Sequence, residues 1–145
     1  MRKMRGTTLV EFTLVASVLM VILFACFEFG RGMFILASLN EGTRRAARLA
    51  AVCPINDPAV SAAVNFLSAP NFTSANVSVN YLDGNGAVLA NPSISTVDFV
   101  SVGIVGYTIP LAIPFVSPVL TVPSFTVTLP AESLGFANTG VSTAC

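Results

Sequence analysis

The sequence predicts an α+β protein with a long N-terminal α-helix that spans a membrane, a short second helix, and a small antiparallel sheet of three or four strands. Two observations carry this prediction. Residues 12–27 contain no charged side chain, and no proline occurs before Pro54. Near Ser74 the pattern changes to alternating apolar and polar residues, which is typical of strands with one buried face.

The composition separates this chain from ordinary soluble domains. Of its 145 residues, 54% are hydrophobic and 10% are charged, against about 25% charged residues in a typical soluble domain. All seven Lys and Arg residues lie within positions 2–48, so we expect no nucleic-acid partner for the C-terminal part. The chain has no His, and its few acids form no catalytic or metal-binding arrangement. We therefore expect no enzyme activity, cofactor, metal or small-molecule substrate.

The first predicted element is a helix of residues 7–53. Residues 12–27 and their apolar flanks are long enough to cross a bilayer core, which takes about 20 residues. The basic residues Arg2, Lys3 and Arg5 precede this span and predict a cytoplasmic N-terminus. At about 1.5 Å per residue, residues 12–52 alone extend roughly 60 Å, so that the C-terminal part of the helix should project from the membrane.

The second predicted helix begins the C-terminal part of the chain, residues 54–145. Asp57 is a suitable N-cap residue, and Pro58 fits the first helical position. The apolar residues of the following segment share one helical face, and Pro70 should end the helix.

The first predicted hairpin begins with the alternating residues 77–82. The sequence Asp83-Gly84-Asn85-Gly86 is a strong turn signal. We therefore expect residues 87–89 to begin a return strand beside residues 77–82.

The remaining strands are predicted on either side of a proline-rich segment. Residues 98–109 are rich in Val and indicate a strand, although they contain two glycines. Residues 110–123 contain four prolines, which exclude a helix or a central strand and predict an extended apolar crossover. Residues 124–129 form the last predicted strand.

The chain contains three cysteines. Cys26 lies in the apolar run, Cys53 follows the long helix, and Cys145 is the last residue. In an oxidising compartment, Cys53 and Cys145 would pair and tie the C-terminus to the end of the helix. Cysteine connectivity does not follow from sequence alone, so the unpaired state stays open as an alternative.

The junction between the basic N-terminus and the apolar helix carries the most specific motif. Gly6 is followed five residues later by Glu11 and then by Phe12. A carboxylate at the edge of a membrane span costs free energy and therefore suggests a function. This order resembles the cleavage motif of type IV prepilins. The resemblance implies that a prepilin peptidase removes the leader, residues 1–6, and leaves Thr7 as an N-terminus that is often methylated.

The chemistry of Gly6 and Glu11 suits the cleavage and assembly roles that the resemblance implies. Glycine allows a protease to approach the backbone closely, which suits Gly6. In an apolar filament core, Glu11 would neutralise the Thr7 amine of a neighbouring subunit, so that neither charge is buried alone. Such a pair sets the register of packed helices more than it adds net stability.

A second resemblance extends over residues 5–52. Its motifs are Val10-Glu11-Phe12, Phe27-Glu28-Phe29-Gly30-Arg31 and Leu39-Asn40-Glu41-Gly42-Thr43-Arg44-Arg45-Ala46-Ala47-Arg48. Together they resemble TadE-like proteins, the pseudopilin-like components of tight-adherence (Flp-type) pili.

This second resemblance implies a minor pilin or pseudopilin that takes part in adhesion. Its implied partners are the prepilin peptidase, other pilin subunits and the inner-membrane assembly platform. Its implied location is the bacterial inner membrane, as a single-pass protein with an extracytoplasmic C-terminal domain, and then the extracellular pilus. Two departures leave the subfamily open, including placement among major pilins: no Pro follows Glu11-Phe12, and Glu41-Gly42-Thr43-Arg44-Arg45 replaces the common Arg-Glu-Gly-Ala-Arg stretch.

Alternative interpretations stand beside these implications. The chain also fits an uncleaved membrane-anchored binding or assembly-factor protein, which needs no free Thr7 amine. The N-terminus also has the basic and apolar regions of a signal peptide, but the Ala-x-Ala site at which such a peptide is cleaved is absent. A lipoprotein cleavage box ending at Cys26 is a further alternative, although it would contain the bulky Phe24. Glu28 and Arg31 also fit an ion pair that marks the membrane exit.

Overall fold

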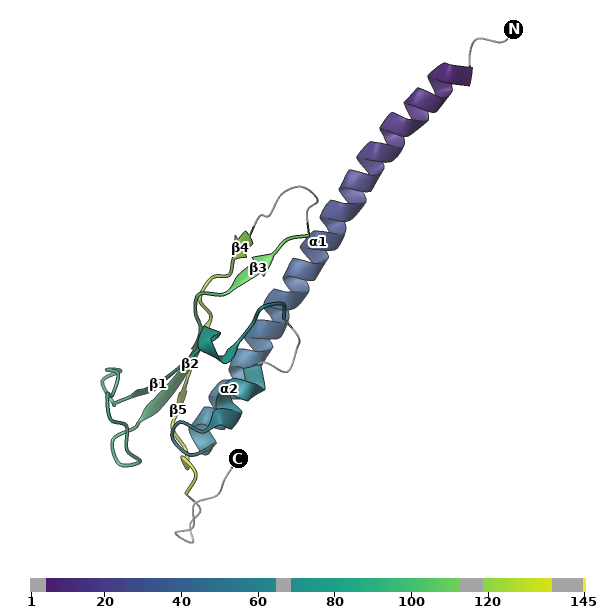
Figure 1. Cartoon of the computed structure of the whole chain (residues 1–145). Coiled ribbons are helices and arrows are strands. Elements are labelled where there is room, and N and C mark those ends of the chain that lie inside the picture. Colours follow the sequence, from purple (N-terminus) through teal and green to yellow (C-terminus); the bar gives the residue numbers. More distant parts are fainter. Residues whose placement is uncertain (1–4, 65–68, 113–118, 137–144) are drawn as a thin grey trace. The chain divides into compact units, whose positions relative to one another are not determined.

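The structure is a computed structural model that describes residues 5–64, 69–112, 119–136 and 145. It confirms the predicted α+β class and divides into two compact units, Met1–Phe34 and Ile35–Cys145. The elements, labelled in Figure 1, are α1 (Arg5–Val52), α2 (Pro58–Val64), the 3-10 helix η1 (Ser74–Asn76), β1 (Val77–Leu82), β2 (Phe99–Ile104), β3 (Thr108–Pro110), β4 (Val119–Thr121) and β5 (Thr126–Pro130).

The first unit contains the N-terminal part of α1, whose large apolar side chains are exposed. Two of its hydroxyl groups bond to the backbone of the helix itself: Thr13 Oγ1 donates to the Leu9 carbonyl at 2.7 Å, and Ser17 Oγ donates to the Leu14 carbonyl at 2.8 Å. These bonds leave few polar groups in need of water, as a membrane interior requires. Within the described residues, α1 is the one helix long and apolar enough to cross a membrane.

The second unit begins inside α1, at Ile35, and not after the end of the helix. From this position onward the helix has a buried face, formed by Ile35, Leu39, Ala46, Ala47, Ala50 and Ala51. The small alanine side chains allow other elements to approach the helix closely. Residues 35–52 therefore belong to the same folded unit as the sheet, whereas the predicted boundary between residues 53 and 54 followed the end of the helix.

Helix α2 begins where its capping residues predict. The Ala59 amide donates to Asp57 Oδ1 at 2.8 Å, and Pro58 occupies the first helical position. Val60 and Val64 of α2 are buried. The expected continuation of this helix toward Pro70 includes residues 65–68, which lie outside the described residues.

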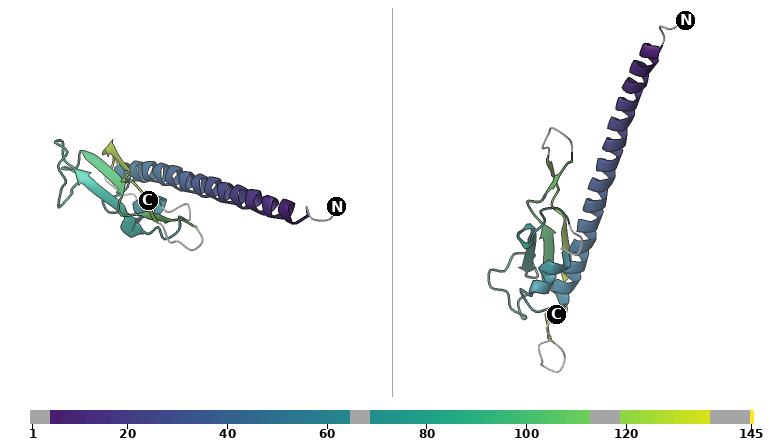
Figure 2. Two further views of the ribbon diagram at one scale, coloured as in Figure 1. Left: turned by 90° about the horizontal axis from the view of Figure 1, so that it is seen from above. Right: turned by 45° about the vertical axis from the view of Figure 1, so that its right-hand side comes forward.

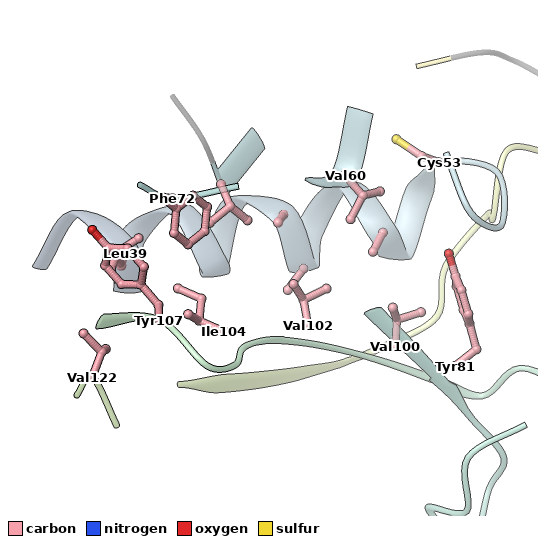
Figure 3. Close-up of a cluster of buried hydrophobic side chains, with 14 of the residues drawn as sticks. Leu39, Cys53, Val60, Phe72, Tyr81, Val100, Val102, Ile104, Tyr107 and Val122 are labelled. Carbon is pink, nitrogen blue, oxygen red and sulfur yellow. The ribbon is translucent and has the colours of Figure 1, made fainter. Parts of the chain in front are cut away.

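The main sheet has the strand order β1-β2-β5, and both pairs are antiparallel. In the central row, Val79 lies opposite Val102, which lies opposite Val127. Val100, Val102 and Ile104 of β2 point toward the buried face of α1, and Tyr81 of β1 joins them (Figure 3). The predicted alternation in β5 is confirmed, because Phe125, Val127 and Leu129 are half-buried between exposed residues.

The predicted hairpin forms only in part. The Asp83 carboxylate accepts the amides of Asn85 at 2.9 Å and Ala87 at 2.8 Å, which fixes the turn. However, the expected return strand reduces to one bridge between Leu82 and Val88, and the true partner of β1 is β2. The reason is local, because Asn91 and Pro92 follow closely and both are strand breakers.

The strand predicted over residues 98–109 is two strands. Gly106 adopts φ +63° and separates β2 from β3, since this left-handed conformation interrupts an extended chain. The crossover prediction for residues 110–123 also needs correction. Its described ends contribute to β3 and β4, which pair as a separate two-stranded sheet (Figure 2). Both strands are edges, where proline is tolerated.

Candidate functional site

The predicted processing junction lies in the first turns of α1. Gly6, Thr7, Glu11 and Phe12 are all helical and exposed. A Cβ atom added at Gly6 would have no other atom within 4 Å. Packing within the described fold therefore does not explain why this position is glycine, and a requirement outside the fold becomes the better explanation.

Glu11 and Thr7 lie on the same face of α1. They are four residues apart, which places them one helical turn from each other. Glu11 is exposed and forms no ion pair among the described side chains. Its surroundings on the helix are large exposed apolar residues, including Leu9, Val10 and Phe12. Glu11 is thus a solitary charge in an apolar surface, where a cation from another molecule would be stabilising.

The second helix motif contains an ion pair. Arg31 Nη2 lies 2.9 Å from Glu28 Oε2, and the two side chains are 25% and 13% exposed. The two residues are three positions apart on the helix, so the structure contains the local ion pair that their spacing allows. Phe29 is exposed, and Gly30 faces open space. The geometry therefore accounts for Glu28 and Arg31 and does not assign a packing role to Phe29 or Gly30.

The end of α1 is held by a part of the chain far away in sequence. The Glu132 amide donates to the Ala51 carbonyl at 3.0 Å, and the Gly135 amide donates to the Val52 carbonyl at 2.6 Å. These bonds satisfy carbonyls that a helix end leaves without intrahelical partners. Gly135 has φ +83°, and a Cβ atom there would lie 2.6 Å from Pro54 Cγ. Sequence reasoning missed Gly135, because its requirement arises only from this long-range contact.

The disulfide lies at this same end of the helix. Cys53 is fully buried and bonds to Cys145, with an S–S distance of 2.01 Å. The bond links two residues separated by 92 positions, so it closes a loop that contains the whole sheet. Cys26 is a free thiol on the exposed surface of α1.

Comparison with known proteins gives one match. Residues 6–48 match the family model described as TadE-like protein. No curated protein and no solved structure matches the chain. The matched segment includes Gly6, Glu11 and the motif from Glu28 to Arg31. The predicted resemblance to TadE-like proteins of the tight-adherence pilus class is therefore confirmed over this segment.

Proposed function

We propose that this chain is a minor pilin or pseudopilin of a tight-adherence pilus. It is a structural subunit that is processed after Gly6 and assembles through α1. One observation carries the proposal: the first unit exposes large apolar side chains along α1 and has Glu11 as the only charge between Gly6 and Phe27. Lipid covers this surface before assembly, and the helices of other subunits cover it afterwards.

Processing creates the charge that Glu11 requires. Hydrolysis of the Gly6–Thr7 bond adds water across the peptide and releases Gly6 as a carboxylate and Thr7 as an amine. The amine enters the filament core with α1, where an unpaired charge would be very costly. Glu11 of an adjacent subunit neutralises it, and this requirement fixes how far one helix can slide along another.

The folded unit, Ile35–Cys145, lies outside the cytoplasm in this proposal. The basic leader favours a cytoplasmic N-terminus, and α1 then carries the rest of the chain across the inner membrane. The bond between Cys53 and Cys145 supports this orientation, because structural disulfides persist in oxidising compartments. The partners of the chain are the prepilin peptidase, the assembly platform and other pilin subunits.

Replacing Gly6 with leucine should prevent processing. The leucine side chain would hinder the close approach of the peptidase to the scissile bond. The expected result is a full-length chain in the membrane and loss of nearly all mature chain, measured by immunoblot and intact mass. Gly30→Leu is a matched control, since Gly30 also lies in α1 with nothing within 4 Å of an added Cβ.

The two variants distinguish the proposal from its alternative. The proposal requires processed Gly30→Leu and unprocessed Gly6→Leu. Processing of Gly6→Leu at an unchanged site would refute the assignment of the scissile bond. A wild-type chain that stays full-length in its native host would instead support an uncleaved membrane-anchored binding or assembly-factor protein.

A further inference from the structure

The folded unit carries charges on two surfaces that form no ion pair among its described side chains. No Lys or Arg follows Arg48 in the sequence, so the acids of the sheet have no nearby cation in sequence. Among the described side chains of this unit, the ion pair is Arg45 with Glu41, at 3.2 Å. Arg44 and Arg48 form no ion pair there. The described part of the folded unit thus presents positive and negative groups that lack an ion-pair partner.

The positive groups form what we call the arginine face of α1. Arg44 and Arg48 are exposed and one helical turn apart, so they share one side of the helix. Beside Arg48 lies an open groove of about 380 Å³. Ala51, Val52, Leu129 and Pro130 give the groove apolar walls, and Glu132 also lines it. The arginine face therefore combines positive charge with an adjacent apolar recess.

The negative groups form what we call the acidic loop, residues 83–98, which connects β1 to β2. Asp83 is held by its turn, and the Asp98 carboxylate lies beside Gly84. Between the two acids, Val88 is 64% exposed and Ile94 is 47% exposed. Figures 1 and 2 show this loop extending from the sheet on the side away from α1. The acidic loop thus combines negative charge with protruding apolar side chains.

We propose that the arginine face of one copy binds the acidic loop of a second copy. Arg44 and Arg48 meet Asp83 and Asp98 of that copy, while Val88 enters the groove beside Arg48. The contact joins two unlike surfaces, so it is heterologous when each copy gives its arginine face to one neighbour and its acidic loop to another. Repeated heterologous contacts build a ring or an open helical array.

The charges define orientation more than affinity in this contact. Exposed ion pairs contribute little free energy singly, but complementary patches select the correct partner surface and disfavour the reverse arrangement. The apolar insertion of Val88 supplies non-directional attraction. Because exposed charges are screened by salt, the contact should weaken as ionic strength rises. This inference rests on the proposed function, which brings copies of the chain together along their helices.

Zero-length cross-linking tests the contact in full-length protein. A donor copy carries Arg48→Lys, Asp83→Asn and Asp98→Asn, and it is co-expressed with an unaltered acceptor copy. A carbodiimide joins the introduced amine to a carboxylate as an amide, while the reagent takes up the released water as a urea. Since only the acceptor retains Asp83 and Asp98, a cross-link to either acid must join two chains. We expect mass spectrometry to find this product.

Two controls define the outcome. A donor with Arg45→Lys in place of Arg48→Lys should couple within its own chain, because position 45 faces Glu41. Asp83→Asn with Asp98→Asn in the acceptor as well removes both reacting carboxylates and should abolish this inter-chain product. No inter-chain product at Asp83 or Asp98 in a correctly processed chain would overturn this inference alone. Coupling to a different pilin subunit would overturn the choice of a second copy, whereas an unprocessed chain would contradict the proposed function.

Discussion

Replacing Gly42 with leucine is expected to destabilise the folded unit by about 2 kcal/mol or more. A Cβ atom at Gly42 would lie 3.1 Å from the Val64 carbonyl oxygen and 3.2 Å from Val64 Cα, both backbone atoms of α2. A leucine must therefore push α2 away from α1, and overpacking of this type costs about 1–3 kcal/mol or more. The higher helix propensity of leucine returns less than about 1 kcal/mol.

The two tyrosines make this stability measurable in the intact protein. Tyr81 and Tyr107 are the only tyrosines, the chain has no Trp, and both side chains are buried in the folded unit. Tyr81 Oη accepts the Asn56 amide at 2.9 Å, and Tyr107 Oη donates to the Pro70 carbonyl at 2.9 Å. Near-ultraviolet circular dichroism followed in the tyrosine band, at longer wavelength than the phenylalanine bands of the apolar helix, therefore reports unfolding of this unit in a urea titration.

Ala37→Leu is the matched control for Gly42→Leu. Ala37 lies on the same helix within the folded unit, and it is exposed. A leucine there adds no overlap, so the urea midpoint should stay near that of the wild type. Equal midpoints for Gly42→Leu and Ala37→Leu would contradict the close packing of α1 against α2.

Replacing Glu11 with alanine is expected to leave processing intact and to reduce incorporation into pili more than about tenfold. The alanine variant keeps Gly6 and Thr7, so the peptidase still releases the Thr7 amine. That amine then enters an apolar filament without its partner. Removing one member of a buried ion pair costs about 3–5 kcal/mol, which exceeds a tenfold change in an equilibrium.

The distribution of mature chain between membrane and sheared filaments measures this effect. Glu11→Gln keeps the shape of the side chain without its charge and should fail as Glu11→Ala does. Thr13→Ala is the control, because the Thr13 hydroxyl bonds to the Leu9 carbonyl of its own helix and should not affect assembly. Normal filament yield and composition for Glu11→Ala would remove the role assigned to Glu11.

Local sequence signals predicted the helices well. Pro54 limits α1, and Asp57 with Pro58 starts α2, because caps and breakers act within a few residues. Alternation likewise located β1 and β5. These features depend on near neighbours in the chain, so one sequence contains most of the information that specifies them.

Features that depend on distant contacts were not predictable in the same way. The partner of β1 is β2 and not the segment after its turn, and β4 formed within a proline-rich stretch. Gly42 and Gly135 are required by approaches to Val64 and Pro54. A glycine within a helix pattern gives no signal for which element will lie against it.

In the candidate site, too, some features follow from local sequence and others depend on side-chain geometry. Order along the chain predicted the ion pair of Glu28 with Arg31, which the structure contains, and the roles of Gly6 and Glu11, which stay predictions. Spacing allows Glu41 to pair with Arg44 or Arg45, and the structure pairs it with Arg45, while Arg44 and Arg48 form no ion pair within the described part of the folded unit. The choice of Arg45 over Arg44 depends on side-chain geometry, which spacing alone does not give.

The most direct test of the proposed function is the intact mass and N-terminal sequence of the protein from its native host. The proposal predicts a chain that begins at Thr7, with or without one methyl group on its amine. A chain that still begins at Met1 would contradict processing after Gly6 and remove the reason to assign Glu11 a role in assembly.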